Sequence, residues 1–268
     1  MNLIYLNKAE SKTNYIMHSL HSHPYYEFFF LTKGERRIFS LNRLYTVSAM
    51  TMLILPPHEM HKMEGGAYER YTVCAHPLFL DETEMDIIKS LSSTAISIPK
   101  EQQDFVLSLL NDLIEVQENE YTTEEEKTYL FRSLFNTLLY IVTKKYSRNE
   151  PQKINNEMPP LLNKILSYLG EHFGEKIVLD DLADEFFVSK STILYNFKKH
   201  LQCSPMDYLL SIRLINAKKY LLDKKKRSIT TISELCGFSS SNYFTEIFKS
   251  KEGLSPTAYR KFHVPTIH

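Results

Sequence analysis

One short segment near the C-terminus constrains the fold of this chain more than any other feature. Residues 237–260 read GFSSSNYFTEIFKSKEGLSPTAYR. The opening Gly-Phe indicates a turn, because glycine adopts the left-handed backbone without steric cost, and serine is a favoured helix N-cap. Phe244, Ile247 and Phe248 then recur at helical spacing. The segment therefore predicts a turn followed by an amphipathic helix, which is the second half of a helix-turn-helix.

A similar pattern lies earlier in the chain. Asp180 and Asp181 favour the start of a short helix, because the N-terminal end of a helix dipole is positive. Ser189 is the expected N-cap of a second helix, Lys190–His200. The apolar residues of that helix lie four apart, so its outer side is expected to carry Ser191, Leu194, Tyr195 and Lys198.

A longer helix, Pro205–Leu222, is predicted between the two copies and would hold them apart. In the C-terminal copy, Ser239 or Ser240 is the expected N-cap of the second helix. The outer side of that helix is expected to carry Ser241, Asn242, Thr245 and Lys249.

Together the two copies resemble the DNA-binding domain of AraC-family transcription regulators. The resemblance rests on the GF…YF…F…GxSPxxYR skeleton and on the segment VSKSTILYNFKKHLQCSP. It implies that two helices enter successive major grooves on one side of duplex DNA, about 34 Å apart. It also implies that the longer helix fixes this separation, with Arg213 and Ala217 on the family's R-x-x-x-A pattern.

The resemblance further implies contacts to bases or phosphates by Ser241, Asn242 and Glu246. Glu246 stands where arginine or lysine is frequent in the family, and Tyr195 where arginine is common. Glu246 either accepts a hydrogen bond from cytosine or is a helix surface residue. For any single outward Ser, Asn or Lys, a solvated surface position is the alternative to a DNA contact.

The charge distribution favours a nucleic-acid module at the C-terminal end. The net charge is +0, but residues 1–154 carry 16 Lys and Arg against 20 Asp and Glu, whereas residues 188–268 carry 14 against 5. A solvated charged surface is the alternative explanation for this excess of basic residues.

The polar, proline-containing stretch YSRNEPQKINNEMPP is typical of a linker. We therefore expect two domains, 1–150 and 151–268.

Composition excludes several classes of protein. Of the 268 residues, 43% are hydrophobic and 24% charged, as in globular proteins, and no apolar run is long enough for a membrane helix. The N-terminus lacks the layout of a signal peptide. The three cysteines, Cys74, Cys203 and Cys236, are widely separated and odd in number, which favours buried thiols in a reducing compartment. The sequence therefore predicts a cytoplasmic protein with no membrane partner.

The N-terminal half combines strands with helices. Residues 1–98 are rich in aromatic and β-branched residues, with turn signals at 32–34, 56–57 and 65–66. From residue 99 to 146, apolar residues recur at helical spacing, first from Phe105 and then from Leu130 to Val142. The whole chain is thus predicted to be α+β, with two domains and an all-α C-terminal double helix-turn-helix.

A polar motif lies within the β-rich region. Residues 21–34 fit H-x-H-x3-E-x6-G, and on a strand alternate side chains share one face, namely His21, His23, Tyr25, Glu27 and Phe29. His61 follows a further apolar strand. Residues 15–80 thereby resemble the cupin-like β-barrel that precedes the DNA-binding module in AraC-family regulators. The resemblance implies an interior effector site with these residues, His61 and Arg37, the last from the basic pair Arg36-Arg37.

Two kinds of site fit this motif. His21, His23, Glu27 and His61 match the cupin ligand set for Fe, Mn, Zn or Ni. The other reading is a polar lining for a small organic effector, and family members commonly keep the motif without a metal, so no cofactor is expected. A sugar or sugar derivative is the predicted effector, with Tyr25 and Phe29 as an aromatic wall. A phosphate, an amino acid or another small anion stays open.

The predicted function is a transcription regulator that binds double-stranded DNA in response to a small molecule. The Leu130–Val142 stripe packs on the barrel, serves a second subunit, or does both, and a homodimer is expected. RNA polymerase is a further candidate partner. No nucleophile–base pair or phosphate-binding glycine loop suggests an enzyme. A metal-binding cupin enzyme fused to a DNA-binding module and a ligand-independent regulator remain the alternatives.

Overall fold

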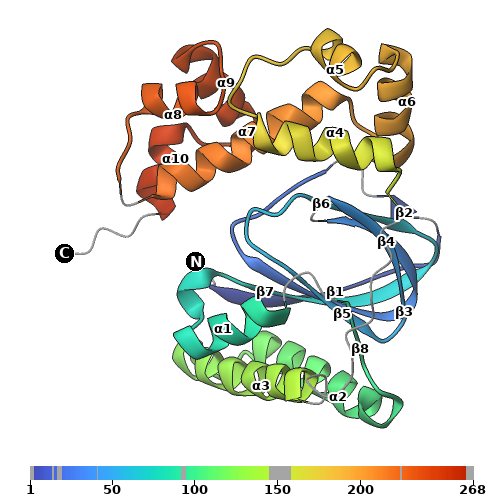
Figure 1. Cartoon of the computed structure of the whole chain (residues 1–268). Helices are drawn as coiled ribbons and strands as arrows, with labels where there is room; N and C mark the ends of the chain where they lie inside the picture. Colours follow the sequence, from blue (N-terminus) through green and yellow to red (C-terminus); the bar gives the residue numbers. More distant parts are fainter. Residues whose placement is uncertain are drawn as a thin grey trace. The chain divides into compact units, whose positions relative to one another are not determined.

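The computed structural model describes residues 3–13, 15–16, 20–40, 42–91, 95–144, 158–223 and 225–263. The chain divides into two compact units, one made by most of residues 1–157 and the other mainly by residues 158–268. The first unit combines an antiparallel sheet with helices, and the second is helical (Figure 1). The predicted two-domain α+β fold is confirmed. The boundary predicted between residues 150 and 151 lies outside the described residues.

The first unit is built around one long strand. Strand β3 (Tyr26–Ser40) pairs through its first half with β5 (Thr51–Leu55) and β7 (Tyr68–Ala75), and through its second half with β4 (Arg43–Ser48) and β6 (His61–Gly65). It therefore belongs to both layers of strands. The remaining strands extend these layers: β1 (Ile4–Ser11) on β7, β2 (Tyr15–Ile16) on β6 and β8 (Ala95–Ser97) on β5.

A β-bulge interrupts β3 where the sequence predicted a turn. Leu31 pairs with Arg70 but Lys33 pairs with Glu69, so Thr32 is an extra residue in the ladder. Gly34 follows with a positive φ of 87°, which glycine adopts without strain. The turn signal at 32–34 corresponds to this bulge and not to a break between strands, because β3 continues through it. An extra residue also inverts the alternation of side chains beyond it.

Two hydrophobic cores form on opposite faces of β3. The interior core, between the two layers, includes Phe29 and Leu31 before the bulge and Ile38 after it. This change from odd to even numbers is the inversion that the bulge imposes. The other face packs under the helices, where the rings of Phe28 and Phe135 meet edge to face at 5.0 Å.

Three helices cover that outer face: α1 (Glu82–Leu91), α2 (Lys100–Glu118) and α3 (Glu124–Lys144), after the short 3-10 turn η1 (Pro77–Phe79). Helix α1 was not predicted and lies within the region expected to be rich in β-structure. Most of the α3 stripe is buried in this unit's own core, through Phe131, Phe135, Leu138 and Val142. Leu130, by contrast, is 40% exposed, and Phe105 of α2 is also exposed.

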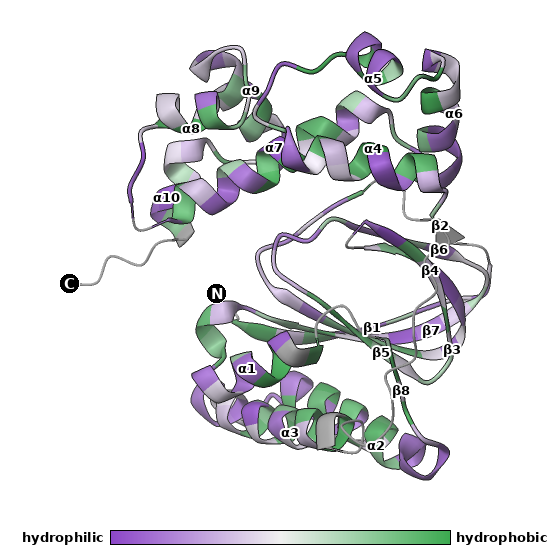
Figure 2. Ribbon diagram, viewed as in Figure 1, coloured by the Kyte–Doolittle hydropathy of each residue, from purple (hydrophilic) through white to green (hydrophobic). Residues whose placement is uncertain are grey.

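The second unit contains α4 (Pro160–Glu171), α5 (Leu179–Glu185), α6 (Lys190–His200), α7 (Pro205–Leu222), α8 (Ile229–Leu235), α9 (Ser241–Glu252) and α10 (Pro256–His263). The bounds of α6 and α7 match the prediction. The described helices of this unit carry both hydrophobic and hydrophilic residues (Figure 2). Helix α7 is buried along much of its length and contributes to the core that α8 and α9 share.

All three cysteines are free thiols, with Cys74 and Cys236 buried and Cys203 half-buried. Among the described helices, none is both long enough and apolar enough to cross a membrane.

Candidate nucleic-acid interface and effector site

The first helix-turn-helix consists of α5 and α6. Ser189 is the N-cap of α6, as predicted, and its hydroxyl oxygen accepts a hydrogen bond from the Thr192 amide at 3.1 Å. Lys190 forms an ion pair with Asp180 at 2.6 Å, which links the start of α6 to the start of α5. The turn between the helices passes through Phe187, which has a positive φ of 53° and is 93% exposed.

Helix α6 has one buried and one exposed side. Ile193 and Phe197 are fully buried, and the Phe197 ring meets the Tyr208 ring of α7 at 5.9 Å. The opposite side is exposed and carries the four residues predicted there: Ser191, Leu194, Tyr195 and Lys198. The outer face of the first helix-turn-helix is therefore available to a partner.

The second helix-turn-helix consists of α8 and α9. Gly237 makes the turn with a positive φ of 71°, as predicted. A Cβ atom at this position would lie 2.8 Å from the carbonyl oxygens of both Phe173 and Gly174. Of the two predicted N-caps, Ser240 caps α9, and its hydroxyl accepts the Tyr243 amide at 3.2 Å.

Helix α9 is also divided into two sides. Phe244 and Phe248 are fully buried in the core that it shares with α7 and α8. Asn242, Glu246 and Lys249 are exposed, as the predicted outer face requires. Ser241 and Thr245 lie at the edge of this face and are half-buried, and the Thr245 hydroxyl donates a hydrogen bond to the Ser241 carbonyl at 2.8 Å.

Buried and half-buried cations hold the second unit together. Arg213 of α7 donates hydrogen bonds from Nε to the Phe173 carbonyl at 2.8 Å and from Nη2 to the Glu175 carbonyl at 2.7 Å. These bonds fasten the chain that follows α4 to α7. The nearly buried ammonium of Lys218, also on α7, lies 3.1 Å from the Glu252 carboxylate at the end of α9. The family pattern pointed to Arg213, but no local pattern in the sequence pointed to Lys218.

A second arginine clamps the C-terminal end of the unit. Arg260 of α10 donates from Nε to the Leu221 carbonyl at 3.1 Å and from Nη2 to the Arg227 carbonyl at 2.6 Å. It therefore joins α10 to the end of α7 and to the segment before α8. Together with Arg213 and Lys218, it fixes how α8 and α9 lie against α7.

The first unit brings two predicted histidines to one buried carboxylate. His23 Nε2 lies 2.8 Å and His61 Nε2 3.6 Å from the same Glu27 oxygen, Oε2. The Nδ1 atoms lie within hydrogen-bond distance of backbone carbonyl oxygens, of Tyr25 at 2.9 Å and of Glu59 at 3.0 Å. Burial opposes ionisation of Glu27, but the hydrogen bond with His23 and the proximity of His61 outweigh it and hold the Glu27 pKa well below its usual value.

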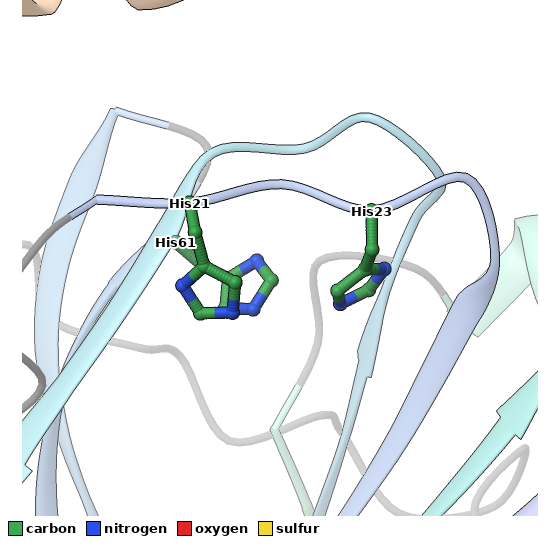
Figure 3. A group of neighbouring side chains, drawn as sticks. All are labelled: His21, His23 and His61. Carbon is green, nitrogen blue, oxygen red and sulfur yellow. The ribbon is translucent and has the colours of Figure 1, made fainter. Parts of the chain in front are cut away.

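His21 also lies in this cluster. The nitrogen atoms that His21, His23 and His61 could offer a metal ion all lie within 4.8 Å of one another (Figure 3). Imidazole and carboxylate groups together suit a divalent transition metal, and so these donor groups fit a metal site. The same groups also suit hydrogen bonding to the hydroxyl groups of an organic ligand.

These residues lie close together, but not because they share one face of a strand, as was predicted. Strand β3 begins only at Tyr26, so His21, His23 and Tyr25 do not share a strand face with Glu27. Pro24 lacks an amide hydrogen and so cannot donate to a strand ladder there. His23 and Tyr25 instead stack with parallel rings 3.9 Å apart in the segment before the strand.

Two other predicted effector residues occupy different environments. Phe29 is buried in the interior core, where it is a packing residue. Arg37 points away from the interior and pairs with Glu64 at 3.5 Å, so its predicted interior position is wrong. The bulge is the physical reason, because it exchanges the two faces of β3 and turns the neighbouring Arg36 inward. Arg36 is 2% exposed and its guanidinium lies 4.6 Å from the Tyr68 ring centroid.

A sheet domain with a polar buried cluster, joined to a unit with two helix-turn-helix motifs, defines a DNA-binding regulator with a separate ligand-binding domain. Two family models agree with this class. A helix-turn-helix domain model matches residues 182–261, and an AraC-like ligand binding domain model matches residues 9–134. The chain belongs to the AraC family of transcription regulators.

Curated relatives extend over most of the chain. The HTH-type transcriptional activator RhaS of Salmonella schwarzengrund is 24% identical over 251 residues, which are 90% of this chain and 87% of the relative. RhaS of an Enterobacter species is 25% identical with the same coverage. Among solved structures, ToxT from Vibrio cholerae O395 matches with a TM-score of 0.39 and 15% identity, over 97% of this chain and 98% of that chain.

Proposed function

We propose that this protein is a transcription activator that binds specific DNA sites in response to a sugar or sugar derivative. The observation that carries the proposal is the pair of capped helices, α6 and α9, each with a buried side and an exposed side. The RhaS relatives, which are activators by name, support activation rather than repression of transcription. Binding of the effector in the first unit would change the affinity of the second unit for DNA.

The DNA contacts are proposed to come from the exposed sides of the two helices. Base edges would be read mainly by polar side chains near the start of each helix, whereas Lys198 and Lys249 would meet phosphates. Ser241 and Thr245, at the edge of the α9 face, would contact the backbone of the DNA or orient their neighbours. The full proposed set is Ser191, Leu194, Tyr195, Lys198, Ser241, Asn242, Thr245, Glu246 and Lys249.

The effector is proposed to bind at the polar cluster of the first unit. His21, His23, Glu27 and His61 supply directed hydrogen bonds, and the ring of Tyr25 stacked on His23 supplies a flat surface. Arg37 faces the other side of β3 and is left out of this site, whereas Phe29 lies on the same face of β3 as Glu27 and stays in it. The competing function is a metal-dependent cupin enzyme that uses the same four polar residues.

We further propose that the active form is a homodimer in the cytoplasm that engages RNA polymerase. The part of the α3 stripe that stays exposed is small, so the surface between subunits would use Leu130 together with Tyr129 and Tyr140, all exposed on the same helix. Sedimentation of the full chain with Tyr129→Ser and Tyr140→Ser tests this surface.

Selection of DNA sites by the purified full chain, with and without sugars, tests the main proposal. Asn242→Ala should weaken specific binding more than non-specific binding, since an amide can read a base. Lys249→Ala should lower the salt slope of binding by about 1. Lys251→Ala is the matched control, because this exposed lysine lies on the same helix but not on the proposed face. Equal effects of Lys249→Ala and Lys251→Ala would contradict the assignment.

Metal analysis separates the proposed regulator from the enzyme. The purified chain should carry no stoichiometric transition metal, and addition of a chelator should leave DNA binding unchanged. A retained metal that is lost in both His21→Ala and His61→Ala would favour the enzyme. A thermal shift with a neutral sugar that is absent in Glu27→Gln would support the effector site.

A further inference from the structure

Strand β7 carries an arginine, Arg70, on the face that lies between the two layers of strands. Side chains alternate along a strand, and Tyr68 belongs to the interior core whereas Tyr71 belongs to the core beneath the helices. Arg70 and Thr72 therefore face the interior, as Tyr68 does. Strand β7 lies between β1 and β3 in this sheet.

Arg70 has no carboxylate within ion-pair distance in the described part of the chain. Arg70 is half-buried, and its guanidinium donates a hydrogen bond to the Thr72 hydroxyl and lies 5.8 Å from the ring centroid of Phe29. The adjacent Glu69 carboxylate points to the other face of the sheet, where it pairs with Lys33 at 2.7 Å. A half-buried cation loses part of its hydration, and a bound anion would compensate for that loss.

A second arginine, Arg36, lies toward this end of the interior. The guanidinium of Arg36 packs on Tyr68, which is two residues from Arg70 on the same face of β7, or about 7 Å along the strand. The buried carboxylate of Glu27 is farther away. It lies opposite Cys74, about 13 Å along β7 from Arg70, and two histidines already surround it.

We propose that Arg70 and Thr72 bind a carboxylate of the effector, and that the effector is therefore a polyhydroxylated carboxylic acid such as a uronic or aldonic acid. A guanidinium binds a planar carboxylate through two parallel hydrogen bonds. The Thr72 hydroxyl accepts from Arg70 and keeps its own proton to donate a third. The hydroxyl groups of the acid extend along the sheet toward His23 and Glu27. This inference rests on the proposed effector site and narrows its ligand from a sugar to a sugar acid.

Calorimetric titration of the full chain with matched ligand pairs tests the inference. The pairs are galacturonate with galactose, glucuronate with glucose, and gluconate with sorbitol, and glucose 6-phosphate is a further anion. At least one acid should bind at least tenfold more tightly than its neutral partner. Arg70→Gln should remove that preference, and Arg70→Lys, which keeps the charge, should retain part of it. Arg37→Gln is the matched control, because Arg37 lies on the other face of β3 and should leave every affinity unchanged.

Each other outcome overturns the inference in a distinguishable way. If neutral sugars bind as tightly as acids, and Glu27→Gln weakens them but Arg70→Gln does not, the effector site stands and the sugar acid is rejected. If only the phosphate binds and requires Arg70, the anion site stands but the carboxylate is rejected. If no ligand of the panel binds, both the sugar-acid ligand and the proposed sugar-responsive function are rejected. Circular dichroism of each variant establishes that it is folded.

Discussion

Replacement of Gly237 by alanine should destabilise the second helix-turn-helix for two separable reasons. The residue has a φ of 71°, a conformation that costs an L-residue roughly 1 kcal/mol or more. In addition, the new Cβ would lie 2.8 Å from the carbonyl oxygens of Phe173 and Gly174. Backbone atoms cannot rotate away as a side chain can, and overpacking of this kind costs about 1–3 kcal/mol. The expected total is about 2–4 kcal/mol.

Two other glycines are matched controls for this prediction. Gly253 has nearly the same φ, 76°, but an added Cβ would meet no atom within 4 Å, so Gly253→Ala isolates the conformational cost of about 1 kcal/mol. Gly170 lies inside helix α4 with similar open space, and Gly170→Ala should stabilise that helix by up to about 1 kcal/mol. The difference between Gly237→Ala and Gly253→Ala is therefore the cost of the close approach.

Hydrogen–deuterium exchange of the full chain measures these differences locally. Peptides from α8 and α9 report local unfolding of the second helix-turn-helix in each variant. A difference of about 2 kcal/mol corresponds to exchange roughly thirtyfold faster in Gly237→Ala than in Gly253→Ala. If the two variants exchange equally fast, the contact between this turn and the chain after α4 does not constrain the structure, and the reasoning fails.

Three further predictions concern the same unit. Ser240→Ala removes the N-cap of α9 and should cost about 1 kcal/mol, whereas Ser239→Ala should cost nothing measurable by calorimetry; equal costs would contradict the assignment of the cap. Phe187→Gly should stabilise the unit by up to about 1 kcal/mol, because glycine relieves a left-handed residue and little packing is lost from an exposed ring; a lower Tm would argue against this. Glu252→Ala removes the carboxylate that faces buried Lys218 and should cost about 3 kcal/mol, and Glu252→Leu combined with Lys218→Met should recover most of it in urea unfolding.

The helical unit was predictable because its signals are local. An N-cap serine, a glycine at the turn and apolar residues at helical spacing each act within a few neighbouring residues, and the bounds of α6 and α7 followed from them. The clustering of His23, Glu27 and His61 was also anticipated, although the reason offered for it was incorrect. Their meeting depends on how the segment before β3 folds back, which no alternation rule describes.

Features that depend on pairing between distant segments were not predictable. The bulge at Thr32 exists because of the register with β7, and it alone decides that Arg36 rather than Arg37 faces the interior. The same holds for Lys218, whose carboxylate partner Glu252 lies on another helix. The apolar stripe of α3 could equally have covered a sheet or a second subunit, and only the packing of Phe135 against Phe28 shows that the sheet takes most of it.

The extra residue in β3 makes this long strand sensitive to its length in an unusual way. Deletion of Thr32 would restore regular alternation, and every side chain from that point to the end of the strand would exchange inside for outside. Ile38 would move toward solvent and Arg37 would replace Arg36 in the interior. One missing residue would thus leave the first half of β3 in its present orientation and would exchange the interior and exterior side chains of the half that pairs with β4 and β6.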